Sequence, residues 1–195
     1  MSPFRPDIVD VWIFRDRKAG PSATSEPEPS RSGVLPADGL EGLAGAAAPG
    51  ADLEILLLRR SPGRILPGLW QCVSGSLEPG ETITAGALRE LREETGIGPA
   101  HIAAFYDLDQ VNQFHEPSAG AVLTGVIFAV RLRSAVEPIL SFEHDEMRWV
   151  PPIEALELAV WPAYRESIRR IVENLGDVDR ASWFELTLAG ARARH

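Results

Sequence analysis

A helix that is charged on one side and apolar on the other constrains the fold of this chain more than any other feature. Residues 82–96 read TITAGALRELREETG. Thr82 is a suitable N-cap, Gly96 suits the left-handed position after the last turn, and strong helix formers lie between them, which predicts a helix over Ile83–Thr95. Its apolar stripe comprises Thr84, Ala87, Leu88, Leu91 and Thr95. Because such a stripe must be buried, we expect the helix to press on a sheet and to leave its charged side in a cleft.

Three carboxylates share one turn on the charged side of this helix. Glu90, Glu93 and Glu94 are related as i, i+3 and i+4, which places them within an arc of about 100°. The Glu90 and Glu94 charges alone cost an isolated helix about 0.2–0.5 kcal/mol, so a cation between them is expected. Oxygen ligands suit Mg²⁺ or Mn²⁺, and the cluster lacks the His and Cys of a zinc site. From spacing alone, a solvated charged face is the alternative.

Two further positions on the same helix bear on this site. Gly86 lies one turn before the carboxylates on their own face, either because a ligand approaches closely there or because the packing is tight. Arg89 can pair with Glu93 four residues later, and it can also reach Glu81 near the helix start. The second pairing would hold the preceding loop on the helix.

Strand-like runs lie on both sides of this helix. β-branched, aromatic and continuous apolar residues predict strands at Asp7–Arg15, Asp52–Arg60, Leu69–Ser74, Ile102–Gln110, Ala121–Leu132 and Met147–Val150. Helices are expected at Ile153–Leu158 and Ala163–Leu175. The tail 182–190 suits either an edge strand or a helix. Strands around one central helix, with helices at the end, indicate the α/β (α+β) class and a mixed α/β sandwich.

The length of 195 residues predicts a single domain spanning 1–195. Within it, two thirds of residues 18–50 are Gly, Ala, Ser or Pro. Such a segment buries too little apolar surface to offset its ordering entropy. We expect a mobile surface insertion between two strands, with a functional lid as the alternative.

The net charge restricts the classes of partner that this chain is expected to bind. With 19 Lys and Arg against 28 Asp and Glu, the formal net charge is −9. This disfavours a general binder of nucleic-acid backbones, which needs a basic face, and an anionic substrate would need a metal or local arginines. No apolar run approaches the roughly 18 residues of a membrane span. The single cysteine, Cys72, and an N-terminus without a secretory pattern favour the cytoplasm.

The spacing within the acidic segment resembles a known family. Gly75, five residues, Glu81, seven residues and then RELREETGI over Arg89–Ile97 match every fixed position of the Nudix box. The match covers 23 residues, and the flanking elements extend the resemblance over 7–175. It implies a Nudix α/β/α sandwich with a mixed central sheet.

The resemblance also implies roles for the residues of the box. Glu90, Glu93 and Glu94 would bind Mg²⁺ or Mn²⁺, and the Gly75 carbonyl would be a further ligand. Arg89 with Glu81 would brace the catalytic loop. Nudix enzymes hydrolyse a nucleoside diphosphate linked to another moiety, by attack of water on phosphorus.

Two segments resemble one subgroup of this family, the first a departure from the general pattern and the second outside the box. The usual Pro-Gly-Gly is replaced by Ser74-Gly75-Ser76 within LWQCVSGSLEPGE. This sequence is similar to that of the bacterial enzymes that hydrolyse dihydroneopterin triphosphate and deoxynucleoside triphosphates such as dATP. The segment FEHDEMRW resembles the Glu-His segment of that subgroup, which implies that Glu143 binds metal or acts as general base. Asp145 and Glu146 are the other candidates for this role. The alternative is that the acidic residues of this loop are ordinary surface charges.

Four residues are candidates for holding the substrate. Trp70 lies beside the metal turn, where it would stack on a base or pterin ring or fill the core. Arg59, Arg60 and Arg64 would grip phosphate oxygens, although two of the three would be only solvated on the alternative interpretation.

These observations together predict a Mg²⁺-dependent diphosphatase. Its substrate would be a small nucleotide or pterin polyphosphate, such as dihydroneopterin triphosphate or dATP, and it would release pyrophosphate or phosphate. One alternative is a dinucleoside polyphosphate (Ap4A-type) hydrolase, or one acting on another substituted nucleoside diphosphate. A second alternative is a non-catalytic nucleotide-sensing module. No nucleic-acid polymer or membrane is an expected partner, and a homodimer stays open.

Overall fold

The structure is a computed structural model, and it describes residues 7–17, 50, 52–117, 120–133 and 136–193. Of the insertion expected at 18–50, only Gly50 belongs to these ranges, so the expectation about that segment lies outside the described residues. None of the described helices is long and apolar enough to cross a bilayer.

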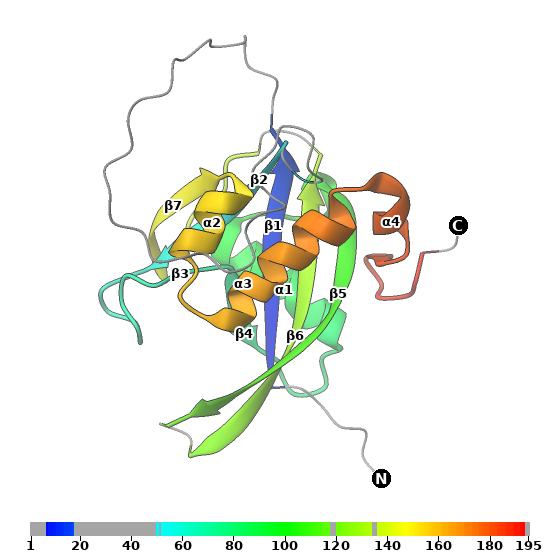
Figure 1. The fold of residues 1–195 in the computed structure, drawn as a ribbon. Helices are drawn as coiled ribbons and strands as arrows, with labels where there is room; N and C mark the ends of the chain where they lie inside the picture. Colours follow the sequence, from blue (N-terminus) through cyan, green and yellow to red (C-terminus); the bar gives the residue numbers. More distant parts are fainter. Residues whose placement is uncertain (1–6, 18–49, 51, 118–119, 134–135, 194–195) are drawn as a thin grey trace, which may run out of the picture.

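One mixed sheet contains all the described strands (Figure 1). They are β1 (Ile8–Asp16), β2 (Leu53–Arg60), β3 (Trp70–Gln71), β4 (Val73–Ser76), β5 (Ile102–Glu116), β6 (Ala121–Leu132), β7 (His144–Val150) and β8 (Glu185–Leu186). The order is β3-β2-β1-β6-β5-β8, with β4 also paired to β1 and β7 to β2. β1 and β6 are parallel, whereas the other strand pairs are antiparallel. The expected mixed central sheet is confirmed.

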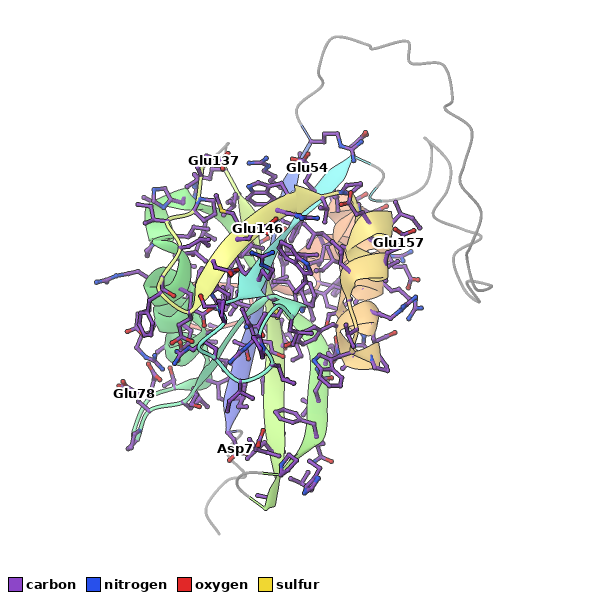
Figure 2. All side chains as sticks on the ribbon, turned by 90° about the vertical axis from the view of Figure 1, so that its left-hand side faces the viewer. Asp7, Glu54, Glu78, Glu137, Glu146 and Glu157 are labelled. Carbon is purple, nitrogen blue, oxygen red and sulfur yellow. The ribbon has the colours of Figure 1, made fainter. Side chains whose placement is uncertain are left out.

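Helices cover both faces of the sheet. They are α1 (Ile83–Thr95), α2 (Pro152–Leu158), α3 (Pro162–Arg170) and α4 (Val178–Ser182), with a 3₁₀ turn at Pro99–His101 and a π turn at Ile171–Leu175. Figure 2 shows α1 on one side of the strands and α2 with α3 on the other. The expected α/β/α sandwich is therefore confirmed.

Alternate residues of β1 enter the two halves of the core. Val11 and Ile13 belong to the apolar cluster that contains Leu91 of α1. Trp12 points to the opposite face, into the cluster that contains Ile168 of α3. The strand is buried on both faces, which explains why its sequence is almost continuously apolar.

The signals at both ends of α1 are confirmed. The Thr82 hydroxyl accepts a hydrogen bond from the Ala85 amide at 3.3 Å, as an N-cap does. Gly96 ends the helix at φ 69°, a left-handed conformation that glycine adopts without strain. Gly86 is explained by tight packing, because a Cβ at this position would overlap the Leu77 side chain.

One predicted strand is two strands in the structure, because its two halves pair with different partner strands. The run over Leu69–Ser74 divides into β3 and β4, with Cys72 between them. β3 pairs with β2, while β4 pairs with the first half of β1. Since β1 pairs with β2 only along its second half, the chain at Cys72 passes from one partner strand to the next.

Other boundaries also differ from those expected. β5 runs to Glu116, past the predicted end at Gln110, because the pairing with β6 resumes after a register shift between Asp107 and Val111. The two strands then extend beyond the sheet as a hairpin (Figure 1). β7 begins at His144, three residues before the predicted start.

The C-terminal helices lie where they are expected, with differences in their bounds and type. The helix predicted over Ala163–Leu175 changes to a π turn at Ile171. The undecided tail contains both expected forms, since α4 ends at Ser182 and β8 then pairs with β5 at an edge of the sheet.

Candidate functional site

A bidentate ion pair fastens the loop before α1 to the helix. Arg89 donates through Nε and Nη2 to the two carboxylate oxygens of Glu81, each at 3.0 Å. The same guanidinium donates to the Ser76 carbonyl at 2.9 Å, and the bonds to Glu81 raise the pKa of Arg89 above its usual range. The planar guanidinium matches the two oxygens of a carboxylate, so Arg89 and Glu81 are arranged as expected for a pair that braces the loop.

Glu90 lies directly against the loop. A Cβ at Gly75 would overlap the carboxylate of Glu90, so a larger residue here would force Glu90 or the loop to shift. Arg89 donates to Glu90 Oε1 at 2.8 Å. Burial raises the pKa of Glu90, and the hydrogen bond from Arg89 opposes that shift. The carboxylate is thus held between α1 and the backbone of β4.

Glu94 is the buried member of the cluster, with 4% of its surface exposed. The backbone amide of Ser74 donates to its carboxylate. Burial, together with the negative charges of Glu90 and Glu143, raises the pKa of Glu94 to about 8. Its Oε2 has no hydrogen-bond partner. An unpaired buried oxygen beside two further carboxylates is an arrangement that a cation stabilises.

Glu143 comes close to the helix cluster from a distant part of the chain. Its carbonyl accepts from the Ser61 amide at 2.8 Å, which joins the loop after β2 to the loop before β7. Its side chain forms an ion pair with Arg64. The Glu143 charge contributes to the raised pKa values of both Glu90 and Glu94.

Asp145 and Glu146 turn away from this cluster. Both form ion pairs with Arg59, at 2.8 and 2.6 Å. The hydrogen bond from Arg59 lowers the pKa of Asp145. The charge of Glu143, in contrast, contributes to the raised pKa of the buried carboxylate of Glu94.

The side chains fit a divalent ion in chemistry, although two of them are directed elsewhere. Within the described ranges, no three Asp, Glu, His or Cys side chains converge on one point as placed. Glu93 is mostly exposed and accepts from Arg89 at 3.1 Å, while Glu143 faces Arg64. The donor set of hard oxygens and the unpaired Glu94 Oε2 suit Mg²⁺ or Mn²⁺. Binding would require Glu93 or Glu143 to leave its arginine.

The residues expected to hold substrate already contact one another or the loops. Arg148 lies over the Trp70 ring at 4.7 Å from its centroid and Arg59 at 5.9 Å, so the ring has cationic neighbours of its own. Arg60 donates to the Ile65 carbonyl at 2.6 Å. Arg64 forms an ion pair with Glu143.

Three buried polar residues near the site were not predicted to act in it. His144 and Gln71 are 5% and 3% exposed, and the His144 Nδ1 lies 3.6 Å from Glu94 Oε2. Burial lowers the pKa of His144 to about 4. Asp10 in β1 hydrogen-bonds the Ser74 side chain, and burial raises its pKa to about 6. A polar residue within an apolar strand pattern was the available signal for Asp10 and Gln71.

Comparison with known proteins identifies the domain. The NUDIX domain family matches residues 44–171. Nudix hydrolase 25 of Arabidopsis thaliana is 32% identical over 142 residues, which cover 60% of this chain and 79% of the plant protein. A Myxococcus xanthus protein named octanoyltransferase is 35% identical over 126 residues, covering 62% of this chain. The chain spans only 33% of that relative's length.

A solved structure shares the fold. The dihydroneopterin triphosphate pyrophosphohydrolase of Escherichia coli superposes with a TM-score of 0.56 at 21% identity. The superposition covers 85% of this chain and 95% of the E. coli protein. At this identity the likeness concerns the fold alone.

Proposed function

The chain belongs to the NUDIX domain family, and from this premise we propose that it is a Mg²⁺-dependent hydrolase of phosphorus anhydrides. The observation that carries the proposal is the buried Glu94, whose unpaired Oε2 lies beside the charges of Glu90 and Glu143. The hydrolase name of the Arabidopsis thaliana relative, which is 32% identical over 142 residues, supports it.

We assign the metal to Glu90, Glu93, Glu94 and the Gly75 carbonyl, with Glu143 as a further ligand or the general base. When bound, the ion neutralises the diphosphate and polarises a water for in-line attack on phosphorus. Arg89 and Glu81 hold the loop so that the Gly75 carbonyl stays beside α1. After leaving Arg64, Glu143 accepts a proton from the attacking water.

The proposed substrate is a nucleoside triphosphate or its pterin analogue, cleaved to release pyrophosphate. The Ser74-Gly75-Ser76 sequence and the Glu143-His144 segment support this substrate, because both resemble the subgroup that acts on it. Arg64 pairs with Glu143, and we assign it to a phosphate oxygen of the bound substrate. The net charge of −9 supports small polyphosphates over nucleic-acid polymers, and the cytoplasm is the proposed location.

A substrate panel tests both the proposed hydrolase activity and the proposed substrate class. Dihydroneopterin triphosphate, dATP, diadenosine tetraphosphate and a nucleotide sugar are incubated with Mg²⁺, and the products are identified by ³¹P NMR. We expect pyrophosphate from the first two. Turnover confined to diadenosine tetraphosphate or to nucleotide sugars would overturn the substrate assignment.

The variant Glu94→Gln separates an enzyme from a sensing module. An enzyme should lose most of its turnover in this variant while staying folded. Saturable nucleotide binding without turnover in the wild-type protein, and unchanged binding in the variant, would contradict the hydrolase assignment.

A further inference from the structure

A chain of polar side chains leads from the surface to the buried carboxylate of Glu94. Arg60 of β2 donates through Nη1 to Gln71 Oε1 at 3.2 Å. The Gln71 Nε2 lies 3.4 Å from His144 Nε2. The His144 Nδ1 faces Glu94 Oε2 at 3.6 Å. Residues from β2, β3, β7 and α1 therefore form one continuous row.

The direction of each hydrogen bond in this row follows from its first member. A guanidinium only donates, so the group of Gln71 that faces Arg60 is its carbonyl oxygen. The other end of the amide is then the NH₂ group, which also only donates. His144 Nε2 must therefore accept, and a neutral imidazole that accepts at Nε2 has its proton on Nδ1.

The proton on Nδ1 faces a carboxylate oxygen that has no other partner. Both His144 Nδ1 and Glu94 Oε2 are buried and lack a hydrogen bond. At 3.6 Å their contact is longer than an ordinary hydrogen bond, and a small rotation of either side chain would close it. The Ser74 amide holds the carboxylate as well, so the two donors together define the plane of the group.

We propose that His144 is a positioning residue for Glu94: its Nδ1–H donates to Oε2 and orients the carboxylate, while Arg60 and Gln71 select the imidazole tautomer that can do so. Metal-binding side chains depend on such outer partners for their orientation. This assignment rests on the proposed function only in naming Glu94 as a metal ligand. The tautomer itself is independent of any reaction.

The tautomer can be observed in the wild-type protein. In a ring-¹⁵N histidine NMR spectrum, His144 should show protonated Nδ1 and unprotonated Nε2. His101 is an internal reference of opposite form, because its Nδ1 accepts from the Gly98 amide at 3.2 Å. The spectra of His144→Asn and His101→Asn assign the two signals. A His144 ring protonated at Nε2 alone would overturn the proposal.

The variant Gln71→Met tests what selects the tautomer. Methionine fills a similar volume but cannot donate to His144 Nε2. We expect the His144 signals to change to a mixture of tautomers, while the His101 signals stay the same. An unchanged single tautomer at His144 would contradict the role assigned to Arg60 and Gln71.

A matched pair of variants tests the positioning. The side-chain amide nitrogen of His144→Asn can occupy the place of Nδ1, whereas that of His144→Gln reaches the place of Nε2. We expect His144→Gln to weaken Mn²⁺ binding, measured by calorimetry, about tenfold, and His144→Asn to restore most of the affinity. The loss of turnover in His144→Gln should appear in kcat, with little change in KM. His101→Asn is the control and should change none of these values.

Equal Mn²⁺ affinities in the two His144 variants would show that the ring only fills space. Denaturation curves distinguish a loss of folding from a loss of orientation, and the wild-type tautomer decides the proposal should both variants unfold. If the tautomer and the Mn²⁺ affinities agree with expectation but no substrate is hydrolysed, the positioning role stands and the proposed function fails.

Discussion

The carboxylate of Glu90 occupies the space that a side chain at Gly75 would need. The loop and α1 are therefore joined on the α1 face of β4 by a backbone contact as well as by the Arg89 brace. Glycine permits this close approach because it lacks a Cβ, and not because of a positive φ, which its backbone does not adopt.

Gly75→Ala should accordingly displace Glu90 or the loop. We expect a loss of about 1–3 kcal/mol in the free energy of unfolding, as for other overpacked sites, together with weaker Mn²⁺ binding. Urea denaturation and calorimetry measure the two effects. Gly63→Ala is the control, because a Cβ there meets nothing within 4 Å. A Gly75→Ala variant with wild-type stability would show that the contact is easily relieved.

The raised pKa of Glu94 makes the stability of the metal-free protein depend on pH. Burial and neighbouring charges raise this pKa from 4.5 to about 8, so the folded state binds the proton more tightly than the unfolded state. The contribution of this group to stability is fully present below pH 4.5. It is lost as the pH rises towards 8, at about 1.4 kcal/mol for each pH unit. Saturating Mg²⁺ should remove much of that loss.

Glu94→Gln should abolish this fall, and it should be more stable than the metal-free wild-type protein at pH 8. Thermal or urea denaturation between pH 5 and 9, with and without Mg²⁺, measures the slope. Glu93→Gln lies on the same turn but is mostly exposed, so it is the matched control. A slope that survives in Glu94→Gln would assign the pH dependence to another group.

Arg64 competes with a metal ion for Glu143. Arg64→Ala should therefore strengthen Mn²⁺ binding in the absence of substrate, while the free energy of unfolding changes by less than about 1 kcal/mol, as is usual for a partly exposed ion pair. Calorimetry and denaturation provide the two values. Arg59→Ala is the control, since Arg59 pairs with Asp145 and Glu146. Weaker Mn²⁺ binding in Arg64→Ala would contradict this competition.

Asp10 provides a second pH effect on the other face of the sheet. Burial raises its pKa from 3.8 to about 6, so its contribution to stability falls as the pH rises through that interval, by about 3 kcal/mol in total. Asp10→Asn should be more stable than wild type above pH 6 and should match it near pH 4, as urea denaturation at the two pH values would measure. Asp16→Asn, at an exposed ion pair with Arg131, should show no such gain.

The sequence predicted best what neighbouring residues determine. The bounds of α1 follow from a cap at Thr82, a left-handed Gly96 and helix formers between them, and all three signals act within one or two turns. The division of residues 69–74 at Cys72 could not be predicted in the same way. It depends on which strands lie beside β1, and that is a long-range property of the fold.

The same distinction applies to the site. The three glutamates of α1 share a face because of helical spacing alone, so their proximity could be predicted. Glu143, which pairs with Arg64, and His144, which lies beside the Gln71 amide, come from a chain segment more than 70 residues away, and nothing local in the sequence identifies them. For Glu143, the resemblance to a family supplied what spacing could not.

Residues 70–76 pair first with β2 and then with β1, and this limits insertions and deletions within the segment. Gln71, Val73 and Gly75 alternate on the face that meets α1, and each has a fixed neighbour there. Inserting or deleting one residue between them would turn the residues on one side of the change to the opposite face. This short segment should therefore keep its length wherever the three contacts are kept.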